Sequence, residues 1–310
     1  MTDIFIDGSA GTTGLRLFER LSARDDVKIF TLTGDDRKDP ARRREALNSC
    51  DVAFLCLPDD ASREAVAMTE NERVTVIDTS TAHRTLGGWA YGFPELSASH
   101  REAVASSKRI AVPGCHASGF VSLVYPLVAN GFISPDTALT CFSLTGYSGG
   151  GKKMIAEYES EERDPLLKAP RQYGISQQHK HLKEMKAIPG LGTEPAFCPI
   201  VADFYSGMEV TVPLFRKDLL CGRTAEDIGI LYKSIYNSPL VKYNDNLNEG
   251  GFVSACALSG KDTMEITVAG NEERILLISR FDNLGKGASG AAIECLNVHL
   301  GLPDEYGLEL

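Results

Sequence analysis

Residues 3–14 read DIFIDGSAGTTG and join a short apolar run to three evenly spaced glycines. The segment 3–7 has the length and composition of a strand. The pattern that follows is GxxGxxG, with Gly8, Gly11 and Gly14, rather than the GxGxxG of the usual dinucleotide fingerprint. Both patterns suit a dinucleotide for the same physical reason. Glycines allow a tight turn and a close approach of the backbone to a pyrophosphate at a helix N-terminus. This stretch therefore predicts a strand, a dinucleotide-binding loop and a helix.

The segments after this loop alternate between strands and helices. The first helix is expected to place Leu15, Phe18 and Leu21 on one face. Continuously apolar residues at 51–57 predict a strand buried on both faces, as in a parallel sheet. Further strands are predicted at 27–32, 74–78 and 109–112, and helices at 61–69 and 97–106. This order predicts a Rossmann-like, doubly wound α/β domain.

The second predicted strand ends where a protein that binds NAD usually carries an acidic residue for the ribose 2′-hydroxyl. Thr33 and Arg37 lie there and suit the 2′-phosphate of NADPH, although Asp35 lies between them. The solvated face of the next helix is the alternative explanation of Arg37. The loop that begins at Pro58 is expected to lie against the adenosine and ribose. The expected cofactor-binding residues are Gly8, Ser9, Ala10, Gly11, Thr12, Thr13, Gly14, Thr33, Arg37, Pro58 and Asn283.

The composition limits the class of protein. The chain has 310 residues, of which 43% are hydrophobic and 24% charged, as in a soluble two-domain protein. Its net charge of −10 argues against nucleic acid or an anionic membrane surface as a partner. No apolar run reaches transmembrane length, and no signal peptide is expected. The eight cysteines form no CxxC pair and lack zinc spacing, so we expect no metal site and reduced, buried thiols in a cytoplasmic protein.

A second domain is predicted after residue 114. Strands are predicted at 137–145, 208–214, 264–269 and 274–281, with a helix at 225–236. They indicate an α+β domain with a mixed sheet that binds substrate and forms an oligomer interface. An apolar helix that runs through His299 is expected to return to the first domain. We therefore predict an NADP-binding domain at 1–114 and 286–310, and a catalytic and oligomerisation domain at 115–285.

Cys115 follows a Pro-Gly turn and begins an apolar helix, so it lies beyond the carboxyl end of the strand at 109–112. Ligands of open α/β sheets bind at that edge. The unpaired N–H groups and the dipole of a helix N-terminus favour a thiolate, which makes Cys115 a candidate nucleophile. The alternative is that Cys115 is a buried small hydrophobic residue, as most free cysteines are.

Other polar residues are candidates for binding an anion or moving a proton. Arg84, with Ser80 nearby, suits a phosphate or carboxylate, whereas a surface salt bridge is the common alternative for a single arginine. The glycine-rich segment 145–153 is an anion-binding nest or a flexible turn. His179 and His181 are spaced two apart at a predicted helix start, so only one of them is expected to face an active site as a catalytic base.

Seven motifs occur in an order that indicates a family. They are GSAGTTG at 8–14, STAHR at 80–84, YGFPEL at 91–96, VPGCHASG at 112–119, GYSGGGK at 146–152, HKHLKEM at 179–185 and DNLGKGASG at 282–290. Together they resemble the N-acetyl-gamma-glutamyl-phosphate reductase family, and within it the shorter, second type. Aspartate-semialdehyde dehydrogenases are similar in fold and chemistry, but their nucleophile usually follows asparagine, whereas Cys115 follows Pro-Gly. The resemblance implies a fold like that of glyceraldehyde-3-phosphate and aspartate-semialdehyde dehydrogenases.

The resemblance also implies an activity. Members of this family use NADPH to reduce N-acetyl-gamma-glutamyl phosphate to N-acetylglutamate 5-semialdehyde, with release of phosphate, in arginine biosynthesis. Cys115 matches the family's nucleophile, which forms a thioester with the acyl group. The catalytic histidine maps to His181 or His179, and His181 is preferred because it directly precedes the Leu-x-Glu of the motif. Lys183 occupies a position where this motif usually has proline.

Substrate binding and assembly follow from the same resemblance. Anionic parts of the substrate would be bound by Ser80, Arg84, Ser148 and Gly149. The enzyme would be a cytoplasmic homodimer or homotetramer whose partner is a small acyl phosphate. Two other functions are compatible with the motifs: a reductase of a homologous substrate, such as acetylated aminoadipate phosphate or aspartyl phosphate, and a non-catalytic NADP-binding regulator. A regulator would be expected to have lost the cysteine and the histidine, and both are present.

Overall fold

The computed structural model describes residues 1–310, which form two compact units. The first unit comprises Met1–Pro94, Ala98–Gly114 and Ala288–Leu308. The second comprises Glu95–Ser97, Cys115–Gly287 and Glu309–Leu310. Unlike in the predicted division, the short segment at 95–97, residues 286–287 and the last two residues lie with the second unit.

The first unit contains a six-stranded parallel sheet, as a doubly wound α/β domain requires. Its order is β2-β1-β3-β4-β6-β5, so β1 lies between β2 and β3. The chain therefore changes direction across the sheet at β1, and the glycine loop begins at the carboxyl end of that strand. The strands are β1 (Thr2–Asp7), β2 (Val27–Phe30), β3 (Val52–Leu55), β4 (Thr75–Asp78), β5 (Ala90–Tyr91) and β6 (Arg109–Ala111).

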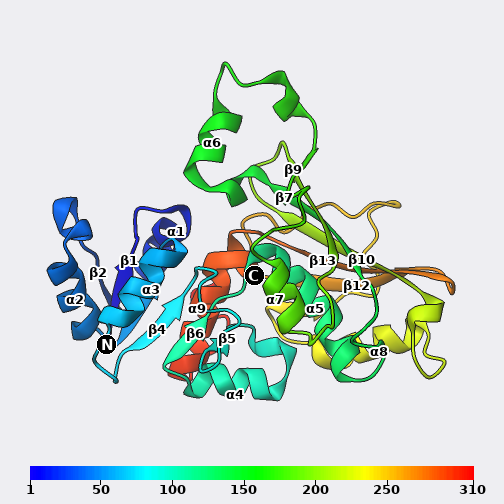
Figure 1. Ribbon diagram of the computed structural model, residues 1–310, viewed down its shortest axis with the longest axis horizontal. Helices are drawn as coiled ribbons and strands as arrows, with labels where there is room; N and C mark the ends of the chain where they lie inside the picture. Colours follow the sequence, from blue (N-terminus) through cyan, green and yellow to red (C-terminus); the bar gives the residue numbers. More distant parts are fainter. The chain divides into compact units, whose positions relative to one another are not determined.

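Helices cover both faces of this sheet (Figure 1). They are α1 (Thr12–Leu21), α2 (Pro40–Ser49), α3 (Asp59–Met68), α4 (Ala98–Ser106) and α9 (Gly290–Leu300). Ile4 and Ile6 pack with residues of α1, α4 and α9, whereas Phe5 between them packs with residues of α2 and α3. This alternation follows from the two-residue period of a strand. The predicted return of the last helix to the first unit is observed.

The predicted apolar face of the first helix is wrong. Leu15 and Phe18 are 46% and 39% exposed, and the buried residues of α1 are Gly14, Leu17 and Leu21. A Cβ atom added at Gly14 would lie 2.4 Å from the carbonyl oxygen of Gly8. The first turn of α1 therefore rests directly on the loop backbone, and this contact, rather than the apolar period, sets the rotation of the helix.

The second unit contains a seven-stranded mixed sheet of order β11-β12-β13-β10-β7-β9-β8. The four predicted strands correspond to β7 (Thr140–Gly146), β10 (Met208–Phe215), β12 (Met264–Gly270) and β13 (Arg274–Phe281). Three further strands were not predicted, and they are β8 (Arg171–Gln172), β9 (Ala196–Ala202) and β11 (Val241–Tyr243). Of these, β9 is long and pairs in parallel with β7 over its whole length.

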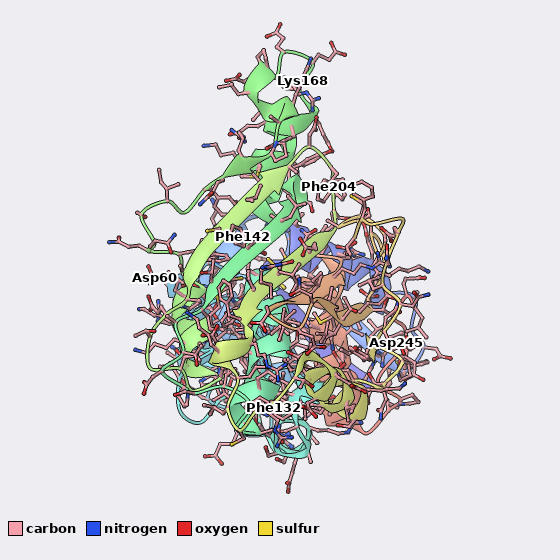
Figure 2. The ribbon with its side chains drawn as sticks, turned by 90° about the vertical axis from the view of Figure 1, so that its right-hand side faces the viewer. Asp60, Phe132, Phe142, Lys168, Phe204 and Asp245 are labelled. Carbon is pink, nitrogen blue, oxygen red and sulfur yellow. The ribbon has the colours of Figure 1, made fainter.

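Two helices, α5 (Cys115–Ala129) and α8 (Ala225–Ile235), pack on one face of the second sheet, and α7 (Leu182–Ala187) packs on α5. The hydroxyl of Tyr236, which follows α8, donates to the carbonyl of Ser122 on α5 at 2.6 Å. In Figure 1, α6 (Gly151–Glu159) and the chain around it project from one end of this unit, and Lys168 marks this projection in Figure 2. None of the helices combines the length and the apolar character that crossing a bilayer requires.

All eight cysteines are free, but they are not all buried as predicted. Cys221 and Cys256 are exposed, whereas Cys50, Cys141 and Cys295 are buried. Burial raises the pKa of Cys50 to about 12, so this thiol stays protonated and unreactive at neutral pH.

A buried ion pair lies at the end of β1, directly before the glycine loop. Asp7 is the last residue of β1, and its Oδ2 accepts hydrogen bonds from Nε and Nη2 of Arg43 on α2 at 3.1 and 3.0 Å. The Arg43 and Asp7 side chains are only 8% and 7% exposed. Burial raises the pKa of Asp7 in spite of the guanidinium beside it. Because neither charge is well hydrated, Asp7 depends on Arg43 as its counterion, whereas Arg43 also donates through Nη1 to the exposed Glu64 at 3.0 Å.

Replacing Arg43 with methionine is expected to lower the free energy of unfolding by about 3–5 kcal/mol, because Asp7 loses its buried counterion. Chemical denaturation of the full chain measures this loss. The adjacent Arg42 is the matched control, since its ion pair with Glu45 is exposed on both sides. Arg42→Met is expected to leave the stability close to that of the parent protein. Equal losses for the two variants would contradict the role given to the buried pair.

Candidate active site

Cys115 is the first residue of α5, as the sequence predicts. The helix is fifteen residues long and almost wholly buried, but the cysteine at its N-terminus is half-buried. The N–H groups of the first turn have no partners within the helix, so the helix end favours a negative charge on the sulfur. A partly accessible thiol at such a position fits a nucleophile better than a packing residue.

His116, the next residue of α5, is a site residue that the sequence analysis missed. Its Nδ1 lies 2.6 Å from the hydroxyl of Ser143 on β7, and its Nε2 lies 2.6 Å from the hydroxyl of Tyr173. Burial, aided by the charges of His179 and Lys180, lowers the pKa of His116 to about 3. The ring is therefore neutral at any physiological pH. The sequence offers one indication of His116 as a site residue, because it is a polar residue at the start of an otherwise apolar helix.

Tyr173 is the second residue that the sequence analysis missed. It follows β8 and packs against an apolar cluster that contains Tyr158, Leu167 and Val201. Burial raises the pKa of its hydroxyl, and the charge of Cys115 raises it further. The hydroxyl therefore stays protonated and is available as a hydrogen-bond donor.

The two histidines of the HxH segment lie beside His116. The ring centroids of His179 and His181 are 4.8 Å apart, and they lie 5.8 and 5.6 Å from that of His116. The prediction that they point to different sides assumed a helix, but α7 begins only at Leu182. In the turn before α7, the backbone N–H of His181 donates to Nδ1 of His179 at 3.2 Å. Burial, together with Lys180, lowers the pKa of His179.

Gln177 fixes the turn that carries these histidines. Its side-chain amide donates to the carbonyl of Phe197 at 2.7 Å and accepts from the Phe197 N–H at 2.8 Å. It thereby pairs with β9 as another strand would. The backbone of Gln177 has a φ of 54°, which few residues with side chains adopt. The two hydrogen bonds hold this conformation in place.

Of the predicted anion-binding residues of the first unit, Ser80 is held by a buried carboxylate and Arg84 by main-chain carbonyls. Asp78, at the end of β4, accepts hydrogen bonds from the hydroxyls of Ser62 and Ser80 at 2.8 and 2.7 Å. Its Oδ2 also lies 2.6 Å from Nδ1 of His83. Arg84 is buried, and its guanidinium donates to the carbonyls of Val112 and Thr79. Arg84 therefore does not form the surface salt bridge that was the alternative explanation of this residue.

The predicted residues of the second unit lie together. The side-chain amide of Asn283 donates to the Ser148 hydroxyl at 3.0 Å and accepts from the Gly207 N–H at 2.9 Å. Ser148 and Asn283 are buried, whereas Gly149 is exposed beside them. Asn283 thus joins two loops of this unit, and its contact with the cofactor stays a prediction.

The glycine loop has the form that a pyrophosphate requires. Gly8 has a φ of 87°, and a Cβ atom there would lie 2.3 Å from the carbonyl oxygen of Cys56. Helix α1 begins after Gly11, and no side chain caps its N-terminus. Its first N–H groups are therefore suited to an anion. Farther along, Thr33 and Arg37 are exposed, and Pro58 precedes the first turn of α3.

Two family models match the two parts of the chain. Residues 3–105 match the NAD-binding domain of semialdehyde dehydrogenases, and residues 115–283 match their dimerisation domain. N-acetyl-gamma-glutamyl-phosphate reductase 2 of Nostoc sp. is 42% identical over 98% of this chain and 98% of its own. The protein of the same name from Pseudomonas putida is 40% identical, again over 98% of each chain. The chain belongs to the N-acetyl-gamma-glutamyl-phosphate reductase family.

Solved structures show the same fold as this member of the family. Aspartate semialdehyde dehydrogenase II of Vibrio cholerae has a TM-score of 0.72 over 97% of this chain and 98% of its own, at 14% identity. The aspartate semialdehyde dehydrogenase of Candida albicans, solved with NADP, has a TM-score of 0.69 at 15% identity, over 96% and 98% of the two chains. The predicted fold class and family are confirmed. The chain is an oxidoreductase with a nicotinamide-binding domain, and the match to a dimerisation domain indicates a homo-oligomer.

Proposed function

We propose that this chain reduces N-acetyl-gamma-glutamyl phosphate to N-acetylglutamate 5-semialdehyde with NADPH, releasing phosphate, in the arginine biosynthesis of the cytoplasm. The observation that carries the proposal is the half-buried Cys115 at the N-terminus of α5, beside a cluster of histidines, in a chain aligned end to end with reductases of that name. The free state of all eight cysteines is in keeping with a reducing compartment.

The first step is acyl transfer to Cys115. The thiolate attacks the acyl carbonyl carbon, a C–S bond forms, and the bond from that carbon to the phosphate oxygen breaks as phosphate leaves. Backbone N–H groups in the first turn of α5 are suited to stabilise the oxyanion of this step. Bound NADPH supplies the hydride that reduces the resulting thioester carbon.

The second step needs a proton donor and acceptor. His181 protonates the oxyanion of the thiohemiacetal, and it takes the proton back when the C–S bond breaks and the aldehyde leaves. We assign this role to His181 rather than His179 because Nδ1 of His179 already accepts the N–H of His181. His116 is excluded from it, since a ring with a pKa of about 3 does not carry the proton at neutral pH.

The anionic cofactor and the anionic substrate are each assigned to groups near their proposed sites. The pyrophosphate of NADPH fits the loop at 8–14, where glycine leaves the backbone open and α1 begins without a cap. Thr33 and Arg37 are assigned to the 2′-phosphate. Anionic parts of the substrate are assigned to Ser80 and Arg84 of the first unit and to Ser148 and Gly149 of the second.

The proposed assembly is a homodimer formed through the uncovered face of the second sheet. Phe142 on β7, Phe215 on β10 and Leu276 on β13 are 44%, 53% and 37% exposed on this unit. Figure 2 labels Phe142 on its strand of this sheet. An apolar strand face of this kind suits burial against a second copy, which agrees with the match to a dimerisation domain.

Cys115→Ser is expected to lower the rate by roughly three orders of magnitude or more, because a serine hydroxyl at this position is a far weaker nucleophile. The assay follows reduced cofactor as purified protein oxidises the semialdehyde in the presence of phosphate and NADP⁺. Cys256→Ser is the control, since Cys256 is an exposed thiol elsewhere in the second unit. Activity retained by Cys115→Ser, or a preference for aspartate semialdehyde in the parent protein, would overturn the proposal.

Replacing each histidine with glutamine separates their roles. His181→Gln is expected to lower kcat about 100-fold or more, because glutamine cannot transfer a proton. His179→Gln is expected to cause a smaller loss, since glutamine can still accept the hydrogen bond from the His181 N–H. Steady-state kinetics on both variants measure the difference. The reverse order of effects would assign the proton transfer to His179.

Arg37→Ala is expected to raise KM for NADPH about tenfold while KM for NADH stays the same, because only NADPH has the 2′-phosphate. Steady-state kinetics of this variant with NADPH and with NADH measure the two KM values. Arg42→Ala on the neighbouring helix is the control for loss of an exposed positive charge. Equal changes of KM for NADPH and for NADH would show that Arg37 does not bind the 2′-phosphate.

A further inference from the structure

The carboxylate of Asp78 is buried inside the first unit, at the carboxyl end of β4. No arginine or lysine bonds to it. Its two oxygens accept from the hydroxyl of Ser62, the hydroxyl and the N–H of Ser80, and the ring of His83. A buried negative charge is costly without a positive partner. His83 is the one group in contact with Asp78 that can carry a positive charge.

Two neighbours of the His83 ring stabilise such a charge. Nδ1 of His83 lies 2.6 Å from Oδ2 of Asp78. One face of the ring stacks on Trp89, with the ring centroids 4.1 Å apart and an angle of 12° between the planes. A carboxylate within hydrogen-bond distance and the face of an indole both attract a cation. The two contacts therefore suit a positively charged imidazole.

The other ring nitrogen of His83, Nε2, is the atom that can meet a ligand. Both nitrogens of a charged imidazole carry a proton, and the Nδ1 proton goes to Asp78. No group of the protein bonds to Nε2, and Nε2 is not one of the fully buried polar atoms that lack a partner. The residue is 5% exposed, and this small exposed surface includes Nε2. The charged ring thus presents one N–H outward.

Ser80 supports His83 in this arrangement. The Ser80 hydroxyl accepts the N–H of Ala82 at 3.1 Å, and its single proton goes to Asp78. No proton of this hydroxyl remains for an anion. Ser80 therefore contributes to an anion site by fixing Asp78 and the turn at 80–82, and His83 is the direct donor.

The place of this loop in the sheet indicates that the donor meets a ligand. Asp78 is the last residue of β4, which lies between β3 and β6 in the parallel sheet. Ligands of open α/β sheets bind beyond the carboxyl ends of such strands. Arg84, next to His83, adds a positive charge that main-chain carbonyls hold in the same loop. The end of β4 thus offers positive charge in a protein whose net charge is −10.

We propose that the Nε2–H of His83 binds the phosphate group of the substrate, and that Asp78 and Trp89 hold the ring in place as a cation. The proposal rests on the proposed function for the identity of the anion, since phosphate is the group that the reaction releases. A hydrogen bond from a charged donor is roughly twice as strong as a neutral one, which suits an imidazolium to this ligand.

The first test uses the fluorescence of the parent protein. Trp89 is the only tryptophan of the chain and stacks on His83, so its emission reports on this ring. A positively charged imidazole quenches an indole that it contacts. Inorganic phosphate is titrated at constant pH and ionic strength, with and without saturating NADP⁺, and Trp89 emission is expected to fall to a plateau. A flat titration under both conditions would overturn the inference without any variant.

The second test removes Nε2 and keeps the contact with Asp78. In His83→Asn the side-chain amide takes the position of Nδ1 and can still donate to Asp78. This variant is expected to raise Kd for inorganic phosphate between about tenfold and a hundredfold, because a hydrogen bond between charged groups is lost. Kd for NADP⁺ is expected to stay the same, which general damage to the domain would not allow. Isothermal titration calorimetry measures both constants.

His299→Asn is the matched control, since the ring of His299 lies 2.8 Å from the Thr75 hydroxyl at the other end of β4. This control is expected to leave Kd for phosphate unchanged. Parent-like phosphate binding by His83→Asn, or an equal loss in His299→Asn, would overturn the inference. If His83→Asn does not fold, the fluorescence titration of the parent protein decides.

Two competitors identify the source of the anion. If NADP⁺ displaces phosphate from this position, the group bound by His83 is a cofactor phosphate, and the assignment to the substrate is overturned. Binding of N-acetylglutamate that depends on His83 and is tighter than that of phosphate would assign a carboxylate to the position and would also overturn it. The expected result is binding of phosphate that neither competitor prevents.

The reverse reaction connects this position to turnover. His83→Asn is expected to raise KM for phosphate by the same factor as Kd, with KM for NADP⁺ unchanged. Binding of inorganic phosphate does not require turnover, so the two proposals fail separately. If the parent protein binds phosphate through His83 but does not oxidise the semialdehyde, the proposed function fails and the phosphate site stands. If it oxidises the semialdehyde and His83→Asn keeps the parent KM for phosphate, only the inference fails.

Discussion

The distance between α5 and the second sheet sets the geometry of the candidate site. A Cβ atom added at Gly119 would lie 2.4 Å from Cγ2 of Val210 on β10, so the helix backbone rests directly on the strand. His116 lies one turn earlier on the same face of α5, and Ser143 is the partner of Val210 on the neighbouring strand. The ring therefore meets the Ser143 hydroxyl, and Cys115 is left at the accessible end of the helix.

This packing gives His116 an environment that differs from that of His179. The close approach of α5 to the sheet buries His116 and removes its charge, as its pKa of about 3 shows. A neutral ring cannot compete for the proton that the reaction moves, but it can hold a fixed pattern of hydrogen bonds. His179 and His181 lie in the turn before α7, and of these two His181 is buried as well, whereas His179 is half-buried. One type of side chain thus occurs in different electrostatic environments within the same cluster.

Helices and strands that depend on residues close together in the sequence were predicted correctly. β13 was predicted at its observed bounds, and the helix at Cys115 begins where the Pro-Gly turn ends. The face of α1 was predicted wrongly because a contact between Gly8 and Gly14 outweighs the apolar period. β9 was missed because Pro199 interrupts a short apolar run. The same holds for the site: Cys115 and the HxH pair have local motifs, whereas the link from His116 to Tyr173 spans 57 positions and exists only in the folded chain.

The charge of the protein constrains how the proposed substrates are bound. A chain with a net charge of −10 repels a phosphorylated substrate and cofactor at long range, so attraction has to come from local groups. The structure offers two helix N-termini for this purpose, at α1 after the glycine loop and at α5 at Cys115. It adds a buried arginine, Arg84, which main-chain carbonyls hold in place. Backbone dipoles and one oriented guanidinium act only at short range, so they bind an anion that fits the site without making the surface basic.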